Sequence, residues 1–336
     1  MQLPAVIFGT SCLGNLYQAL DDEIKRQILK EIFTQMEDVA VLDSAGKYGA
    51  GLALEVLGRE LKRLNIQADQ VIISNKLGWY RVPLKTAEPT FEPGAWKNIT
   101  HDAIQKISYQ GIKACWEQGC NLLGDGYKPQ MVSIHDPDEY LSAAENESER
   151  NRRFEDIVAA YEALIDLRNK METKSVGVGA KNWKIIRDIA AVVDLDWVMF
   201  ANSLTIYHHP PELLEFIDTL QRKGITIINS AVFHAGFLTG GNYFDYRFVD
   251  PLSEEGRYLF NWRERFFKVC RIHGILPAEA CVRFGMSHPG IRSIALNTSK
   301  PERIKQNISL TSASIPVSFW QMMKTERLIS DSYKYI

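Results

Sequence analysis

Short apolar segments alternate with longer amphipathic segments along this chain. Eight apolar segments have the length of a strand and are rich in Val and Ile: residues 5–9, 39–43, 71–75, 131–135, 175–179, 197–201, 225–229 and 291–296. None of them alternates regularly between apolar and polar residues, which is typical of strands buried on both faces, as in parallel sheets. We therefore predict parallel strands over these eight segments.

The intervening segments carry apolar residues at helical spacing. Ile24, Ile28 and Ile32, for example, recur every four residues and form one face. The same pattern predicts helices over residues 23–36, 52–64, 154–168, 183–193, 212–222 and 301–308. Strands that are each followed by a helix favour an α/β fold of the closed (β/α)₈ barrel type, since a doubly wound open sheet usually has fewer strands. We expect a single barrel domain over residues 1–336.

Two connections between the predicted strands are long. One runs from Gly78 to about Thr100, and the other runs from Ala231 to about Glu255. Both follow strands, so in a barrel both lie at the C-terminal rim, where active-site loops are found.

Composition narrows the class of protein. Of the 336 residues, 46% are hydrophobic and 24% are charged, and the net charge of -2 gives no basic field for binding nucleic acid. The apolar run 189–201 is interrupted by Asp194 and Asp196, so we expect no membrane span, and the first residues do not resemble a signal peptide. The five cysteines form no C-x-x-C pair and fit free thiols in the cytoplasm.

Four polar residues stand at or just after the ends of consecutive predicted strands. Asp43 ends the second, Tyr48 follows it between two glycines, Lys76 ends the third and His135 ends the fourth. Each alone has an ordinary structural explanation, as a loop cap, a rim aromatic, a paired strand-end amine or a turn residue. Together they can converge on one point of the barrel mouth.

These four side chains suit proton transfer at a carbonyl or hydroxyl oxygen. A phenol with its usual pKa near 10 exchanges protons poorly at neutral pH, and we expect the ammonium of Lys76 to lower the pKa of Tyr48. Asp43 would neutralise that ammonium, and His135 would donate a hydrogen bond that orients the substrate oxygen. No metal is expected, because His208 and His209 lack ligand spacing.

Several motifs along nearly the whole chain resemble those of the aldo-keto reductase superfamily. They are FGTSCLGNLY, LDSAGKYGAGLALEVLG, VIISNKLG, SIHDPD, SVGVGAKNW, GFLTGG and LNTSKPERIKQN. The resemblance implies a catalytic tetrad at Asp43, Tyr48, Lys76 and His135. Within the superfamily the chain is most similar to the branch of L-fucose and D-threo-aldose 1-dehydrogenases, which oxidise C1 of a sugar to a lactone.

The resemblance also implies a nicotinamide cofactor, either NAD or NADP, bound without a Rossmann fold. The carboxamide would meet Asn202, and the backbone amides of the 236–241 loop would cover the pyrophosphate. The implied cofactor-binding residues are Gly179, Asn202, Ser230, Gly236, Leu238, Asn297, Thr298, Arg303, Gln306 and Asn307.

The chain departs from the family pattern at three cofactor positions. The usual Ser-Asn pair reads Gly179-Ala180, and the usual stacking Tyr reads Ser230. Asn297 replaces the lysine that pairs with the 2′-phosphate of NADP, although Arg303 remains. A lost ammonium weakens phosphate binding more than ribose binding, so we favour NAD.

For the substrate, a small sugar or other carbonyl compound, we expect a pocket of aromatic and polar groups at Asn15, Tyr17, Trp79 and Tyr80. Two other functions stay open: an aldehyde or ketone reductase that uses NADPH, and a non-enzymatic subunit that binds the cofactor and senses redox state. A monomer or a small homo-oligomer is expected.

Overall fold

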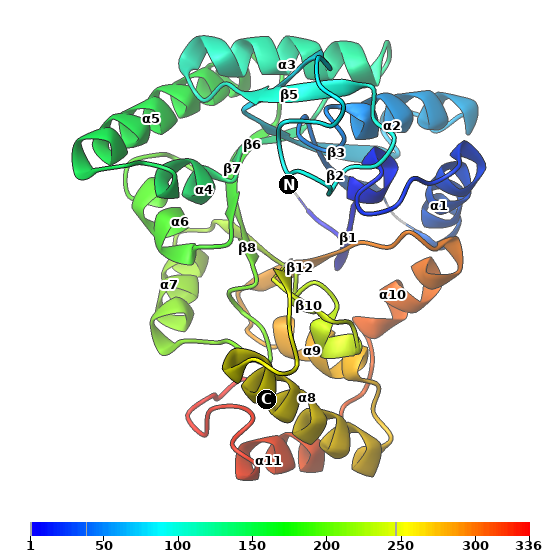
Figure 1. Ribbon diagram of the computed structural model, residues 1–336, viewed down its shortest axis with the longest axis vertical. Coiled ribbons are helices and arrows are strands. Elements are labelled where there is room, and N and C mark those ends of the chain that lie inside the picture. Colours follow the sequence, from blue (N-terminus) through cyan, green and yellow to red (C-terminus); the bar gives the residue numbers. More distant parts are fainter. Residues whose placement is uncertain (1, 38, 246) are drawn as a thin grey trace.

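The eight predicted strands close into a parallel barrel. A computed structural model describes residues 2–37, 39–245 and 247–336. The hydrogen-bonded order around the barrel is β1-β12-β9-β8-β7-β6-β3-β2 (Figure 1). The strands are β1 (Val6–Gly9), β2 (Ala40–Ala45), β3 (Val71–Leu77), β6 (Met131–His135), β7 (Ser175–Ala180), β8 (Trp197–Ala201), β9 (Thr226–Ser230) and β12 (Ile291–Leu296). The predicted (β/α)₈ barrel is confirmed.

Helices surround the barrel, and those predicted from apolar spacing are present. They are α1 (Asp22–Gln35), α2 (Leu52–Arg63), α5 (Glu147–Asn169), α6 (Trp183–Ala190), α7 (Pro211–Arg222) and α10 (Ile304–Leu310), the last preceded by the 3₁₀ turn η3 (Pro301–Arg303). Helix α5 begins earlier than predicted because Asn146 caps it by accepting a hydrogen bond from the Glu149 amide.

Other helices were not predicted. They are α3 (Tyr109–Leu123), α4 (Pro137–Ser142), α8 (Glu254–His273), α9 (Pro277–Gly285) and α11 (Val317–Thr325). The N-caps Ser108 and Ser253, which accept from the amides of Gly111 and Gly256, are signals that could have located α3 and α8.

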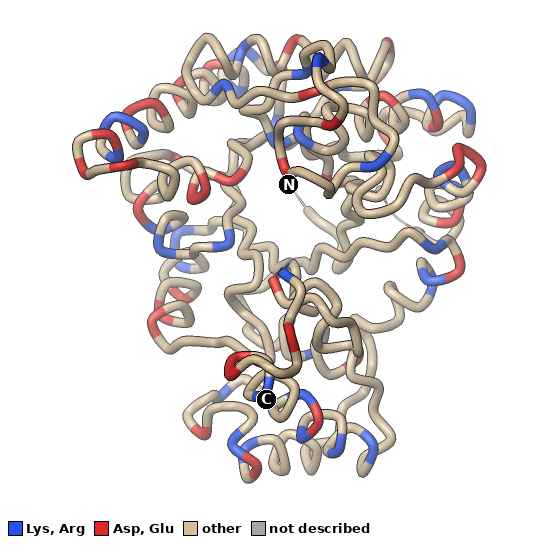
Figure 2. Tube along the Cα trace, viewed as in Figure 1, with Lys and Arg blue, Asp and Glu red and all other residues tan. Residues whose placement is uncertain are grey.

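The apolar strand residues pack in the core, and the charged residues lie mainly on the surrounding helices (Figure 2). One apolar cluster comes from the strands and the N-terminal segment, and includes Ile7, Val41, Trp197 and Ile228. Strand β1 completes the barrel by pairing with β12, where Val6 lies opposite Ile294. No helix in the described ranges has the length and apolar content needed to cross a membrane.

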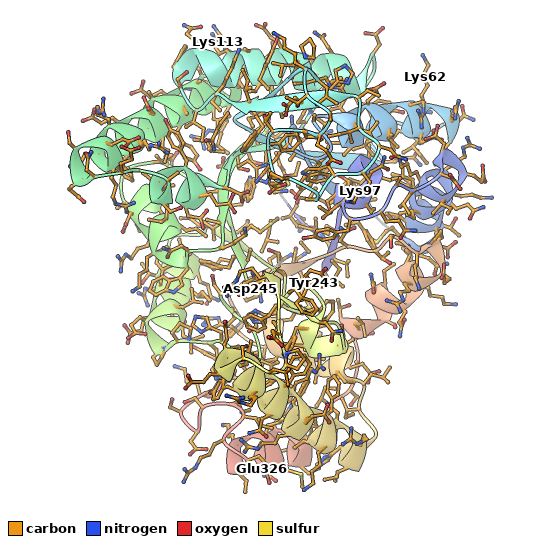
Figure 3. The ribbon with its side chains drawn as sticks, in the orientation of Figure 1. Lys62, Lys97, Lys113, Tyr243, Asp245 and Glu326 are labelled. Carbon is orange, nitrogen blue, oxygen red and sulfur yellow. The ribbon has the colours of Figure 1, made fainter. Side chains whose placement is uncertain are left out.

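Both long connections contain small antiparallel hairpins. In the first, β4 (Trp79–Pro83) pairs with β5 (His101–Gln105). The second contains the 3₁₀ turn η2 (Phe237–Thr239) and the strands β10 (Tyr243–Phe244) and β11 (Arg247–Phe248). Tyr243 and Asp245 of this second hairpin lie near the middle of the view (Figure 3).

Candidate active site

The ammonium of Lys76 lies between a carboxylate and a phenol. Its Nζ pairs with Asp43 Oδ2 and donates to the Tyr48 hydroxyl at 3.1 Å. Asp43 Oδ1 accepts from the Ser74 hydroxyl at 3.0 Å. This arrangement follows from strand pairing, because Asp43 is opposite Ser74, and Lys76 is opposite Ala45, between the parallel strands β2 and β3.

The turn after β2 places Tyr48 above Lys76. The Tyr48 amide donates to the Ala45 carbonyl at 3.1 Å, and Gly49 takes a left-handed conformation with φ of +62°. The 3₁₀ turn η1 (Ser11–Gly14) presses against this turn so closely that a Cβ on Gly14 would lie 2.7 Å from the Tyr48 carbonyl carbon. Glycine is therefore required where these two segments touch.

Burial reverses the expected net shift of the Tyr48 pKa. Removal of the half-buried phenol from water raises its pKa, Lys76 lowers it, and the charge of Asp43 opposes Lys76. The pKa is therefore raised overall, and the expectation that Lys76 makes the phenol more acidic than usual is wrong for the net effect. Burial disfavours the Lys76 ammonium as well, but Asp43 and Tyr48 outweigh this and raise the pKa of Lys76.

His135 faces Tyr48 as a neutral imidazole. The two rings meet edge to face with centroids 5.5 Å apart. Burial lowers the pKa of His135 to about 3; the cations Lys47 and Lys76 add to this shift, and Asp136 opposes it. Its Nδ1 is buried and has no hydrogen-bond partner among the described residues, whereas its Nε2 lies 3.4 Å from Asp136 Oδ2. A neutral ring can orient a substrate oxygen by one hydrogen bond.

An aromatic wall stands beside Tyr48. The Trp96 ring centroid is 5.9 Å from that of Tyr48, and Phe91 lies 6.3 Å from Trp96 and 5.7 Å from Trp79. Of these three wall residues, only Trp79 was predicted. Trp96 and Phe91 belong to the long connection after β3, and their place in a rim loop is the signal that could have found them.

The other predicted substrate residues do not all join this wall. Both ends of the Asn15 amide are used, since Nδ2 donates to the Lys97 carbonyl and Oδ1 accepts from the Leu20 amide. Tyr80 packs against a different apolar cluster, under the ammonium of Lys106, because neighbouring strand residues point to opposite faces. Tyr17 is 52% exposed and stacks on Tyr243 of the second hairpin, with centroids 6.5 Å apart.

The predicted carboxamide site contains an amide oxygen that has no partner among the described residues. Asn202 directly follows β8 in a left-handed conformation, and its Oδ1 is buried and has no partner among the described residues. Gly179 lies opposite Met199 in the neighbouring strand pair. Ser230 lies opposite Ala201, and its hydroxyl donates to the Phe200 carbonyl at 2.9 Å. Asn202 therefore has a buried oxygen that can accept a hydrogen bond from a ligand.

The backbone amides of the 236–241 loop already donate hydrogen bonds to nearby backbone carbonyls. The N–H groups of Gly236 through Gly241 donate to carbonyls of residues 233–237 at 2.9–3.1 Å, and the Leu238 side chain is buried. In this conformation a pyrophosphate would have to share or exchange these hydrogen bonds. The predicted contact through backbone amides therefore stays a prediction.

The predicted adenosine site lies at the start of α10. Asn297 donates from Nδ2 to the Ser11 hydroxyl at 2.6 Å, and Thr298 accepts from the Lys300 amide at 3.1 Å. Asn307 is buried, whereas Arg303 and Gln306 are exposed. Arg303 has no ion-pair partner among the residues that the structure describes, so its guanidinium can reach a ligand.

Known proteins share both the sequence pattern and the fold. The sequence pattern of the Aldo/keto reductase family matches residues 5–325. A pyridoxal 4-dehydrogenase of Microbacterium luteolum is 26% identical over 343 residues, covering 98% of this chain and 96% of that protein. A D-threo-aldose 1-dehydrogenase of Pseudomonas sp is 24% identical over 341 residues, covering 98% of this chain and 95% of that protein.

Two solved structures are similar in fold. An aldo-keto reductase from Bacillus halodurans in its holo form superposes with a TM-score of 0.68 at 17% identity, covering 98% of this chain and 93% of that one. The glycerol dehydrogenase from Gluconobacter oxydans gives a TM-score of 0.67 at 15% identity, covering 99% and 94%.

Proposed function

The chain belongs to the Aldo/keto reductase family and is an oxidoreductase, and from this premise we propose that it oxidises C1 of a free aldose to a lactone. The substrate would be a sugar of the L-fucose or D-threo-aldose type. The contact of the Lys76 ammonium with both Asp43 and the Tyr48 hydroxyl carries this proposal, because it is an arrangement built for proton exchange at one phenol.

The family implies a nicotinamide cofactor, and the residues at the barrel mouth fit one. The buried, unpartnered Oδ1 of Asn202 would accept a hydrogen bond from the carboxamide, and Arg303 would reach the adenosine end. When bound in its oxidised form, the cofactor would supply the hydride acceptor.

Tyr48 would be the general base in oxidation and the general acid in the reverse direction. In oxidation the Tyr48 phenolate, stabilised by the Lys76 ammonium 3.1 Å away, would take the proton of the C1 hydroxyl and become the neutral phenol. Asp43 keeps the buried Lys76 charged through the transfer. His135, neutral near pH 7, would donate one hydrogen bond to the substrate oxygen.

We propose NAD as the preferred cofactor. Asn297 stands where a lysine would pair with a 2′-phosphate, and its amide is held by Ser11. Arg303 has no ion-pair partner among the residues described and would still offer a charge to a 2′-phosphate, so NADP would bind more weakly than NAD but would still bind. We also propose one domain for the whole chain, and a cytoplasmic location, since the five cysteines are free thiols.

A second candidate substrate is an aromatic aldehyde such as pyridoxal. Trp79, which is partly exposed and packs against the buried Phe91 of the wall, would suit stacking on a heteroaromatic ring. A 26% identical relative is named a pyridoxal 4-dehydrogenase. An aldehyde with a neighbouring hydroxymethyl group also closes to a cyclic hemiacetal, so the same proton and hydride chemistry applies to both candidates.

A panel of free aldoses and pyridoxal, each with NAD and with NADP, tests the proposal by following formation of the reduced cofactor. We expect turnover of at least one aldose with NAD and formation of its lactone. The same panel in reverse, with aldehydes and NADPH, tests the reductase alternative. Turnover of pyridoxal or of simple aldehydes alone would overturn the aldose proposal, and a strong preference for NADP would overturn the choice of cofactor.

A further inference from the structure

The turn that carries Tyr48 holds a second buried lysine, which the proposed reaction does not use. Lys47 is 3% exposed. Its Nζ lies 2.7 Å from Glu92 Oε1, 3.1 Å from Asp136 Oδ2 and 3.3 Å from Glu139 Oε2. One ammonium thus joins three carboxylates from two other rim segments, the β4–β5 connection and the start of α4. A buried ammonium is tolerated only with such partners.

Two of these carboxylates, Glu92 and Asp136, also contact residues that pack against Tyr48. Glu92 Oε2 accepts from the Trp96 indole nitrogen at 2.7 Å, and the Trp96 ring lies against Tyr48. Asp136 Oδ2 lies 3.4 Å from His135 Nε2, and the His135 ring meets Tyr48 edge to face. A continuous polar chain therefore runs from the aromatic wall through Lys47 to the imidazole.

We propose that Lys47 is a positioning residue. Through Glu92 and Asp136 it holds the Trp96 and His135 rings in place next to the turn that carries Tyr48. It also balances the charge of Asp136 near the Tyr48 phenol. Its kinetic consequences rest on the proposed function.

The charges that face Tyr48 determine what removal of Lys47 does. They are Lys76 and Asp43 from the strands β3 and β2, and Asp136 together with the neutral His135 from the end of β6. Asp136 raises the pKa of Tyr48, and Lys47 is its nearest counter-charge. Without Lys47 the negative charge of Asp136 is no longer balanced by the neighbouring ammonium. The repulsion between Asp136 and the phenolate then increases, so the pKa of Tyr48 rises further. An ion pair that only stabilises the fold would leave the titration of Tyr48 unchanged.

The test compares Lys47→Met with Lys47→Arg and with Lys128→Met. Lys128 is the matched control, since it pairs with Glu172 at 2.6 Å on the exposed surface. Two measurements are made: kcat and KM for the best aldose across pH, and the ¹H–¹⁵N signal of the Trp96 indole, identified with Trp96→Phe. The indole signal reports on the hydrogen bond to Glu92 and requires no activity.

In Lys47→Met we expect kcat/KM to fall about tenfold, since the wall and the imidazole lose their fixed place. The rising limb of the oxidation profile should move up by about one pH unit. The Trp96 indole signal should shift or broaden. Lys47→Arg, which keeps the charge, and Lys128→Met should stay within about twofold of the parent in kcat/KM and keep the indole signal.

A folded Lys47→Met with an unchanged indole signal and an unchanged pH limb overturns the proposal. If Lys47→Met does not fold, Lys47→Gln takes its place, because it removes the charge and keeps a polar side chain among the three carboxylates. A shifted indole signal in Lys47→Gln supports the proposal, and an unchanged one overturns it. If the parent oxidises no aldose, the proposed function fails, whereas the indole signal still decides the role of Lys47.

Discussion

At the scale of single residues, Tyr48 is the group on which the proposed chemistry depends. Its hydroxyl is 3.1 Å from the Lys76 ammonium, and burial rather than that ammonium determines the direction of its pKa shift. A raised pKa means that the phenol is protonated at neutral pH. We therefore expect oxidation to speed up as the pH rises above neutral and reduction to slow down, because oxidation needs the phenolate.

Replacement of Tyr48 by Phe should abolish turnover and preserve cofactor binding. Only the proton-exchanging hydroxyl is lost, so kcat should fall by roughly 10²–10⁴-fold while the ring keeps its contacts with Trp96 and His135. Steady-state kinetics and a cofactor titration by fluorescence measure the two effects. Tyr80→Phe is the matched control, because Tyr80 packs in another cluster and should retain activity. Full activity in Tyr48→Phe would falsify the assignment.

His135 should make the stability of the protein depend on pH. Its folded pKa of about 3 lies below the usual value near 6.5, so the unfolded chain binds the extra proton between these values. The free energy of unfolding should therefore fall as the pH drops below about 6.5, by up to about 1.4 kcal/mol per pH unit from this one group.

Denaturant unfolding of the parent and of His135→Asn between pH 7.5 and 4.5 should show this difference in slope (the pH range spans the usual histidine pKa of about 6.5). The variant should lose less stability on acidification than the parent. His273→Asn, a change on the outer helix α8, is the control and should follow the parent. Parallel curves for the parent and His135→Asn would show that the imidazole is not held neutral.

At the scale of elements, the site depends on two turns, η1 and the turn after β2, whose backbones are in direct contact. The 3₁₀ turn η1 after β1 and the turn after β2 meet at Gly14 and Gly49, where a Cβ on Gly49 would lie 2.4 Å from the Gly14 carbonyl oxygen. The first rim loop and the second therefore meet backbone to backbone at these two glycines. The position of Tyr48 is therefore determined by β1 and β2 together.

Gly14→Ala should disturb the active site as well as the fold. The added methyl group meets the Tyr48 backbone at 2.7 Å, and such overpacking typically costs about 1–3 kcal/mol. Thermal unfolding and kcat measure the two effects, and both should fall. Gly124→Ala is the control: it introduces strain at φ of +76° in open space, so it should lower stability without lowering kcat. If Gly14→Ala lost stability but kept its kcat, η1 would not be needed to position the active site.

At the scale of the whole molecule, the barrel brings distant parts of the chain to one mouth. The Asn202 amide, the Arg303 guanidinium and the Tyr48 phenol each follow a different strand of the closed parallel barrel: β8, β12 and β2. A cofactor that spans these positions binds only the folded barrel. Its binding free energy therefore adds to the stability of the fold.

Thermal unfolding in the presence of cofactor should reveal the preferred dinucleotide without any substrate. At a free concentration of 100 times its Kd, a cofactor adds about 2.7 kcal/mol to stability. At equal concentrations we expect NAD to raise the Tm more than NADP, because Asn297 lacks a charge for the 2′-phosphate. Adenosine monophosphate serves as the control for the adenosine end. A larger rise with NADP would contradict the choice of NAD.

The local pattern of the sequence determined the eight strands, most of the helices and the positions of Asp43, Lys76 and His135 near the ends of their strands, although β2 and β3 continue past Asp43 and Lys76 to Ala45 and Leu77. Apolar runs and helical spacing are properties of neighbouring residues, so they can be read along the chain. Because parallel strands end at one rim, the convergence of these side chains could also be predicted.

The tertiary structure alone decided which neighbours each group has. In the folded chain Tyr80 points away from the site, and the Asn15 amide is hydrogen-bonded to the backbone. Lys47 lies among carboxylates from two other loops. The tertiary structure also decided the sign of the Tyr48 pKa shift. Burial and charge balance are sums over residues far apart in the chain, and a local pattern does not contain those sums.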